Sequence, residues 1–178
     1  MVFSSLIFLF VFLPLVLFTY CLAPQKAKNA LLLLASLVFY AWGEPRYILI
    51  MLFSTVFDYV NGLLIQQYKE RGEGRRAKAV VLLSVIINLG ILGFFKYSGF
   101  LVENVNRLFS LRLSSPNIAL PLGISFYTFQ TLSYTIDVYR GEVDAQRNII
   151  DFGAFVALFP QLVAGPIVRY KTIATQLN

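Results

Sequence analysis

The sequence contains no histidine, so it lacks the side chain that most readily serves as a general base near neutral pH. Its single cysteine, Cys21, excludes a disulfide within the chain and any metal site built from cysteines. Charged residues make up only 13% of the chain, about half the share of a soluble domain. The chain also has no glycine-rich phosphate loop, and we expect it to bind no metal and no cofactor.

Hydrophobic residues dominate instead, at 58% of the 178 residues. They form long runs separated by short charged connections, a pattern typical of an all-α, polytopic helical membrane protein. The net charge of +6 is gathered in those short connections, so it indicates membrane orientation rather than a nucleic-acid partner. The lipid bilayer is therefore the first expected partner.

Five apolar runs are expected to form membrane helices, and Pro14 is expected to kink the first of them. The runs cover residues 3–22, 30–42, 47–65, 79–95 and 151–168. The second run is short for a span, so it is either lengthened by its flanks or partly re-entrant. Residues 99–113 mix apolar and charged side chains, which predicts an amphipathic interfacial helix.

The lysines and arginines predict how the chain crosses the membrane. Residues 69–78 carry five of them, so this loop is expected on the cytoplasmic side. Alternation then places Lys26 and Lys28 inside and the N-terminus outside.

Three polar residues interrupt the third and fourth runs, where a carboxylate or amide is costly. Asp58 and Asn61 belong to the third run and Asn88 to the fourth. Asp58 and Asn88 lie equally deep, roughly 12 Å from the cytoplasmic ends of their helices. Antiparallel neighbours would bring them into contact, either as a polar clasp between helices or with a direct functional role.

The stretch 124–142, ISFYTFQTLSYTIDVYRGE, places polar side chains along one face of a helix. At 100° per residue, Tyr127, Gln130, Tyr134 and Asp137 gather on that face. They form either an internal packing network or the wall of a water-accessible chamber, and Arg140 could pair with Asp137. In residues 159–170, FPQLVAGPIVRY, two prolines and a glycine predict a helix broken within the membrane, which again suggests a chamber.

These motifs resemble those of the membrane-bound O-acyltransferases, particularly the membrane subunit of bacterial alginate O-acetylation. PLGISFYTFQTLSYTIDVYRGE (residues 121–142) and FPQLVAGPIVRY carry the resemblance most specifically. VFSSLIFLFVFLP near the N-terminus and LVFYAWGEPRYILIML (residues 37–52) fit the same group.

The resemblance implies a multi-pass enzyme of the bacterial inner membrane that moves an acyl group, most simply acetyl, onto a hydroxyl of an exported polysaccharide such as alginate. It further implies an acyl donor, for which acetyl-CoA is a candidate, and extracytoplasmic acetylation proteins as partners. Family members are longer and use a buried histidine, which this chain lacks. Residues 1–178 are therefore expected to form the N-terminal part of a single transmembrane domain and to carry no catalytic residue.

Two other functions stay open. Broken helices and the intramembrane carboxylate of Asp58 would also suit a membrane transport or export subunit. A non-catalytic membrane scaffold for a partner protein is the other alternative.

Overall fold

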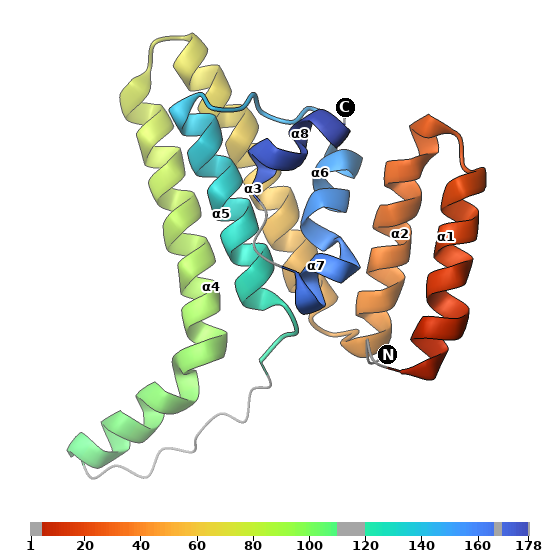
Figure 1. The fold of residues 1–178 in the computed structure, drawn as a ribbon. Helices are drawn as coiled ribbons and strands as arrows, with labels where there is room; N and C mark the ends of the chain where they lie inside the picture. Colours follow the sequence, from red (N-terminus) through yellow and green to blue (C-terminus); the bar gives the residue numbers. More distant parts are fainter. Residues whose placement is uncertain (1–4, 110–119, 166–168, 178) are drawn as a thin grey trace.

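The computed structural model describes residues 5–109, 120–165 and 169–177, and these residues form helices joined by short connections, with no strand among them (Figure 1). A π-helical segment, Phe8–Phe12, comes before the first α-helix. The α-helices are α1 (Leu13–Leu22), α2 (Gln25–Gly43), α3 (Ile48–Glu70), α4 (Gly74–Phe109), α5 (Ile124–Arg140), α6 (Ile149–Ala157), α7 (Phe159–Ala164) and α8 (Tyr170–Leu177).

Two of the described helices, α3 and α4, are long and apolar enough to cross a membrane. Their large apolar side chains are exposed on one side, as at Val56 and Ile86, which are 51% and 66% exposed. A face of this kind is stable against lipid and unfavourable in water. The all-helical membrane fold that the composition predicts is confirmed.

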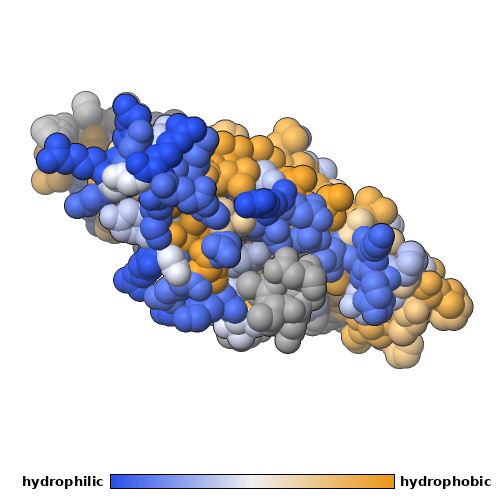
Figure 2. Space-filling view, turned by 90° about the horizontal axis from the view of Figure 1, so that it is seen from above, coloured by the Kyte–Doolittle hydropathy of each residue, from blue (hydrophilic) through white to orange (hydrophobic). Residues whose placement is uncertain are grey.

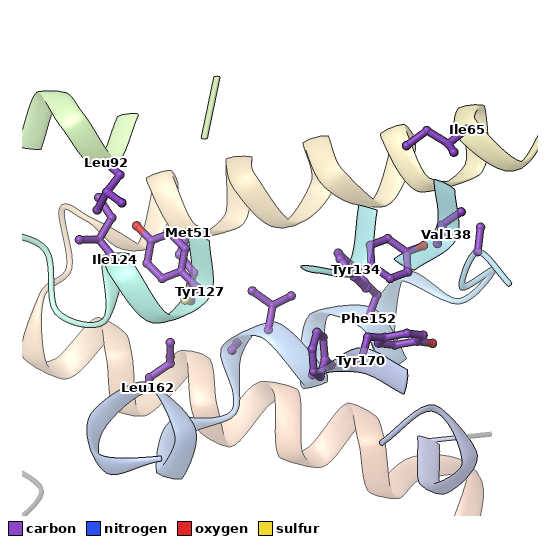
Figure 3. Close-up of a cluster of buried hydrophobic side chains, with 14 of the residues drawn as sticks. Met51, Ile65, Leu92, Ile124, Tyr127, Tyr134, Val138, Phe152, Leu162 and Tyr170 are labelled. Carbon is purple, nitrogen blue, oxygen red and sulfur yellow. The ribbon is translucent and has the colours of Figure 1, made fainter. Parts of the chain in front are cut away.

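The helices pack as two groups that meet between α3 and α6. In the first group α3 packs against both α4 and α5, and in the second α2 packs against α6, with α1 on the outside of α2. In Figure 1 α3 and α5 run in the same direction and α4 runs opposite to both. Between the groups, Tyr134 of α5 packs against Phe152 of α6 and Tyr170 of α8, with ring centroids 4.5 and 5.0 Å apart (Figure 3).

Several helices are longer than the apolar runs predict. α2 begins at Gln25 and covers 19 residues, so the short second run is lengthened by its polar flank and is a complete helix. α3 and α4 extend into the predicted ten-residue loop, and only a tight turn at residues 71–73 separates them. Gly72, with φ of 73°, supplies the left-handed backbone that this turn needs.

The predicted interfacial helix at 99–113 is not a separate element. Residues 99–109 continue α4 without interruption, and the helix bends toward its C-terminal end (Figure 1). No proline separates the two parts, and the helix runs through Ser98 and Gly99 across the change in hydropathy. Residues 110–113 lie outside the described part of the chain.

Prolines disturb the helices close to where the sequence predicts. Just before Pro14 the backbone widens into the π-helical segment, and the N–H of Leu13 donates to the carbonyl of Phe8. Ahead of Pro160 the chain leaves the helix at Leu158, so α6 and α7 are separate helices. The N–H of Phe159 donates to Ser36 Oγ at 3.3 Å, which satisfies one backbone group freed by the break.

The basic residues concentrate at one end of the helical bundle, called here the basic end. It carries the connections 23–24, 71–73 and 141–148 (Figure 1), and Figure 2 looks down on it. Its described cations are Lys26, Lys28, Lys69, Arg71, Arg75, Arg76, Lys78, Arg140, Arg147, Arg169 and Lys171. Arg46, Lys96 and Arg107 lie toward the opposite end. Figure 2 shows hydrophilic residues gathered over the basic end, with hydrophobic residues along its margins.

Gly62 of α3 provides a test of this packing. A Cβ at this position would meet the ring of Tyr134, whose Cε1 would be only 2.6 Å away, whereas a Cβ at Gly90 of α4 would meet nothing within 4 Å. We expect Gly62→Ala to lower the free energy of unfolding by about 1–3 kcal/mol, because a buried tyrosine must move. Gly90→Ala should be neutral or stabilising. Denaturant titration of helicity in detergent measures both, and equal effects would contradict this packing.

Candidate functional site

A buried carboxylate lies where α3, α4 and α5 meet. Asp58 of α3 is fully buried and accepts hydrogen bonds from two side chains of α4. Ser84 Oγ donates to its Oδ1 at 2.6 Å, and Asn88 Nδ2 donates to its Oδ2 at 2.8 Å. The contact between Asp58 and Asn88 that their equal depth predicts is therefore confirmed.

Further polar groups surround this carboxylate. Asn61, one turn along α3, donates weakly to Asp58 Oδ1 at 3.5 Å. Thr131 of α5 lies close to Asp58 and its Oγ1 donates to the carbonyl of Thr128 at 3.2 Å, and Thr135 Oγ1 lies 3.5 Å from Ser84 Oγ. All of these residues are buried, so the network is closed to solvent within the described helices.

Sequence reasoning missed Ser84, Thr131 and Thr135. The available signal was helical spacing, because Ser84 lies one turn before Asn88 and the two threonines lie one turn apart. Hydroxyl residues are common in apolar helices and often bond their own backbone, as Thr135 also does to the carbonyl of Leu132. Their spacing alone could not show which of them faces Asp58.

The four polar residues predicted to share one face of α5 are all buried. Tyr134 Oη accepts a hydrogen bond from the backbone N–H of Gln146 at 3.0 Å. The Oε1 atom of Gln146 in turn accepts from the N–H groups of Arg147 and Asn148. Tyr134 therefore holds the connection between α5 and α6 against the bundle.

Tyr127 and Gln130 are differently placed. Gln130 Nε2 donates to Oε1 of Gln161, on the short helix α7, at 2.8 Å. Gln130 Oε1 and the hydroxyl of Tyr127 have no hydrogen-bond partner among the described residues, and neither has Ser54 Oγ of α3. A buried polar atom without a partner costs about 1–3 kcal/mol, so these atoms mark places where water, a ligand or further chain would be favourable.

Asp137 does not pair with Arg140, which corrects one expectation. Asp137 is only 3% exposed, and its Oδ2 has no hydrogen-bond partner within the described chain. Arg140 is exposed, because α5 ends there and Gly141 turns the backbone with φ of 77°. The helix end therefore directs the arginine toward solvent and leaves the carboxylate among packed side chains.

The end of α2 fixes the start of α5. Tyr40 Oη donates to the carbonyl of Leu122 at 2.9 Å, and Glu44 Oε2 accepts from the N–H of the same residue at 2.7 Å. Both backbone groups just before α5 are thus held by one helix end. The AWGEPRY and PLGISFY motifs, far apart in sequence, meet at this point, which determines where Tyr127 and Gln130 lie.

The described residues include no group of histidine, cysteine, aspartate or glutamate side chains suited to a metal ion. One cavity of about 170 Å³ lies at the basic end between α3, α5 and the connection after α5. Its lining includes Lys69, which donates to the carbonyl of Val138 at 3.2 Å, and the carboxylates Glu70 and Asp144. This mixed lining favours neither an anion nor a cation.

Comparisons with known proteins find relatives that are named for acetyl transfer. No family model and no solved structure matches it. Over its whole length it is 47% identical to the probable alginate O-acetylase AlgI of Pseudomonas aeruginosa, of which 35% is covered. It is 46% identical to the protein of the same name from Azotobacter vinelandii, covering 36% of it, and 32% identical to a peptidoglycan O-acetyltransferase of Helicobacter pylori, covering 39%. The chain therefore spans about a third of the length of these curated relatives.

The contact between Asp58 and Asn88 yields a stability prediction. Asp58→Ala should lower the free energy of unfolding by about 1–3 kcal/mol, because the donors on α4 lose their acceptor. A double-mutant cycle with Asn88→Ala should give a coupling energy of about 0.5–2 kcal/mol, measured by denaturant titration in detergent. As a control, Asn104→Ala removes an amide that bonds only a carbonyl of its own helix and should change stability by less than about 0.5 kcal/mol. Strictly additive effects of Asp58→Ala and Asn88→Ala would refute the contact.

Proposed function

Given that the chain belongs with the alginate O-acetylases, a type of membrane-bound O-acyltransferase, we propose that it forms the N-terminal membrane part of an enzyme that transfers an acyl group, most simply acetyl, to a hydroxyl of an exported polysaccharide. Similarity over the entire chain carries this proposal. Both kinds of curated relative are named for O-acetyl transfer to a bacterial polysaccharide, alginate or peptidoglycan. The acyl donor, the polysaccharide and extracytoplasmic acetylation proteins are the partners that this function requires.

The unpartnered polar atoms support a role for α5 in that enzyme. We infer that Tyr127 and Gln130 line a chamber within the membrane, because both keep a buried polar atom free for another group. Tyr134 braces the chamber instead, since its hydroxyl already bonds Gln146 and its ring packs against Phe152. Asp137 completes the same face toward the basic end. The Asp58 network holds α3, α4 and α5 in the arrangement that positions these residues.

The chain does not itself provide the chemistry of transfer. Removal of a proton from a sugar hydroxyl is best served by a group whose pKa lies near neutrality, and the sequence contains no histidine. The buried Asp58 carboxylate is occupied by hydrogen bonds from Ser84 and Asn88, so its oxygens are not free to accept a proton from a sugar hydroxyl. We therefore place the catalytic base outside these residues.

The distribution of cations supports an orientation in the bacterial inner membrane. We propose that the basic end faces the cytoplasm, because cytoplasmic connections are enriched in lysine and arginine. In a Cys21→Ala background, Gly74→Cys should resist an impermeant thiol reagent in intact cells, whereas Arg46→Cys at the opposite end should react. Both should react after the membrane is opened. The reverse labelling pattern would show that the orientation is wrong.

A chimera tests the acyltransferase function. The chain would replace the matching segment of the Pseudomonas aeruginosa relative in a strain that lacks that protein, and acetyl groups on the exported alginate would be measured. We expect acetylation to be restored, because the replaced helices would supply the same scaffold. The purified 178-residue chain alone, given an acetyl donor and alginate, should transfer nothing above background. A chimera that is present in the membrane and acetylates no alginate would contradict the proposed function.

The same chimera separates the role of α5 from the function as a whole. Tyr127→Phe removes only the unpartnered hydroxyl, so it should reduce acetylation by about three- to tenfold without loss of protein from the membrane. Tyr139→Phe, a partly exposed tyrosine of the same helix, is the matched control and should leave acetylation unchanged. Full activity of Tyr127→Phe would exclude this residue from the chamber and leave the family function intact.

A further inference from the structure

Three cations around the turn between α3 and α4 have no partner within the described chain. Glu73 pairs with Arg76 at 2.6 Å, and Glu70 accepts a hydrogen bond from Gln66 at 2.9 Å, so both carboxylates of the turn are engaged. The side chains of the remaining cations, Arg71, Arg75 and Lys78, are exposed and form neither an ion pair nor a hydrogen bond with any described residue.

These cations continue the lipid-facing surfaces of the two membrane helices. On α4, Arg75 and Lys78 are followed at helical spacing by Leu82, Ile86 and Leu89, which are 51%, 66% and 44% exposed. The cations and the exposed apolar residues therefore lie along one stripe of this helix.

On α3 the exposed stripe includes Phe53, Val56 and Val60, and the helix ends immediately before Arg71. The tight turn at residues 71–73 brings the ends of the two helices together. All three cations thus lie where the apolar surface of both helices stops.

That position is the level of the phospholipid headgroups. A lipid packed along the exposed stripe of α4 would place its acyl chains against Leu82 and Ile86 and its phosphate beside Arg75 and Lys78. Arginine binds phosphate oxygens through two parallel hydrogen bonds, and lysine adds a compact positive charge. Clusters of cations next to a membrane helix attract anionic lipids with about 1 kcal/mol for each charge.

We propose that Arg71, Arg75 and Lys78 form a binding site for the headgroup of an anionic phospholipid, with the exposed stripe of α4 as the surface for its acyl chains. The ligand is a membrane lipid rather than a soluble anion, because the cations and the apolar stripe form one continuous surface. Nothing in this proposal depends on the enzymatic function or on which face of the membrane the basic end occupies.

The opposite end of the bundle offers a matched control. Arg46, Lys96 and Arg107 are also three cations, but they are spread over the connection before α3 and two distant positions of α4. Lys96 in addition lies over the ring of Tyr97, with its Nζ 5.6 Å from the ring centroid. Lys28 makes a similar contact with Tyr20 at 5.1 Å. Replacing these three residues removes the same charge without touching the proposed site.

Electron paramagnetic resonance with spin-labelled lipids tests the proposal on the 178-residue chain in phosphatidylcholine bilayers. The fraction of motionally restricted label gives the association of phosphatidylglycerol relative to phosphatidylcholine. We expect the unmodified chain to prefer phosphatidylglycerol, and Arg71→Gln/Arg75→Gln/Lys78→Gln to lower that preference by roughly fivefold or more. Arg46→Gln/Lys96→Gln/Arg107→Gln should retain it. Circular dichroism verifies that both variants keep their helicity.

Three results would overturn the proposal. One is equal association of the two lipids with the unmodified chain, and another is an equal loss of preference in both triple variants, which would indicate net charge rather than a site. The third is release of the bound lipid by inorganic phosphate but not by chloride at the same ionic strength, which would show a site for free phosphate.

Discussion

The requirement that polar groups be satisfied inside an apolar medium determines how these helices pack. Asp58 could not remain in the middle of α3 without donors, because an unpaired carboxylate within the membrane is strongly unfavourable. Ser84 and Asn88 supply those donors from α4, and Thr135 of α5 contacts Ser84. The two carboxylate oxygens of Asp58 thus determine how three helices are rotated about their axes. That rotation in turn determines which apolar side chains are exposed.

The opposite situation holds on an adjoining part of the α5 surface. Tyr127 and Gln130 keep buried atoms without partners, although neighbouring residues such as Tyr134 have theirs. Two adjoining parts of the α5 surface therefore differ: the part with Thr131 and Thr135 packs into the Asp58 network, whereas the part with Tyr127 and Gln130 keeps polar atoms without partners. The contacts of Tyr40 and Glu44 with Leu122 fix this second part in place from α2.

How far the sequence predicts this structure depends on the kind of signal. Hydropathy gives the membrane class and the positions of α3 and α4, and equal depth gives the contact between Asp58 and Asn88. Helical periodicity gives the buried face of α5. Helix ends are predicted poorly, because α3 and α4 extend through charged residues that hydropathy assigns to a loop, although lysine, arginine and glutamate are good helix formers. The same reasoning explains why the interfacial segment is continuous with α4.

Side-chain pairing is the feature of the structure that could not be predicted from the sequence. Asp137 and Arg140 are one turn apart, yet Gly141 ends the helix so that one is buried and the other exposed. Ser84, Thr131 and Thr135 join the Asp58 network for reasons of helix rotation, which depends on all contacts at once. Such pairs follow from three-dimensional packing, and spacing along one helix predicts only which residues are candidates.

The short turn between α3 and α4 also has a consequence for how the chain enters the membrane during synthesis. A lone carboxylate at the centre of an inserting helix costs about 2.5–3.5 kcal/mol on the insertion scale. Because only residues 71–73 separate the two helices, Asn88 and Ser84 follow Asp58 out of the ribosome within a few tens of residues. α3 and α4 can therefore leave the translocation channel as a hairpin whose carboxylate is already hydrogen-bonded, before α5 enters the membrane.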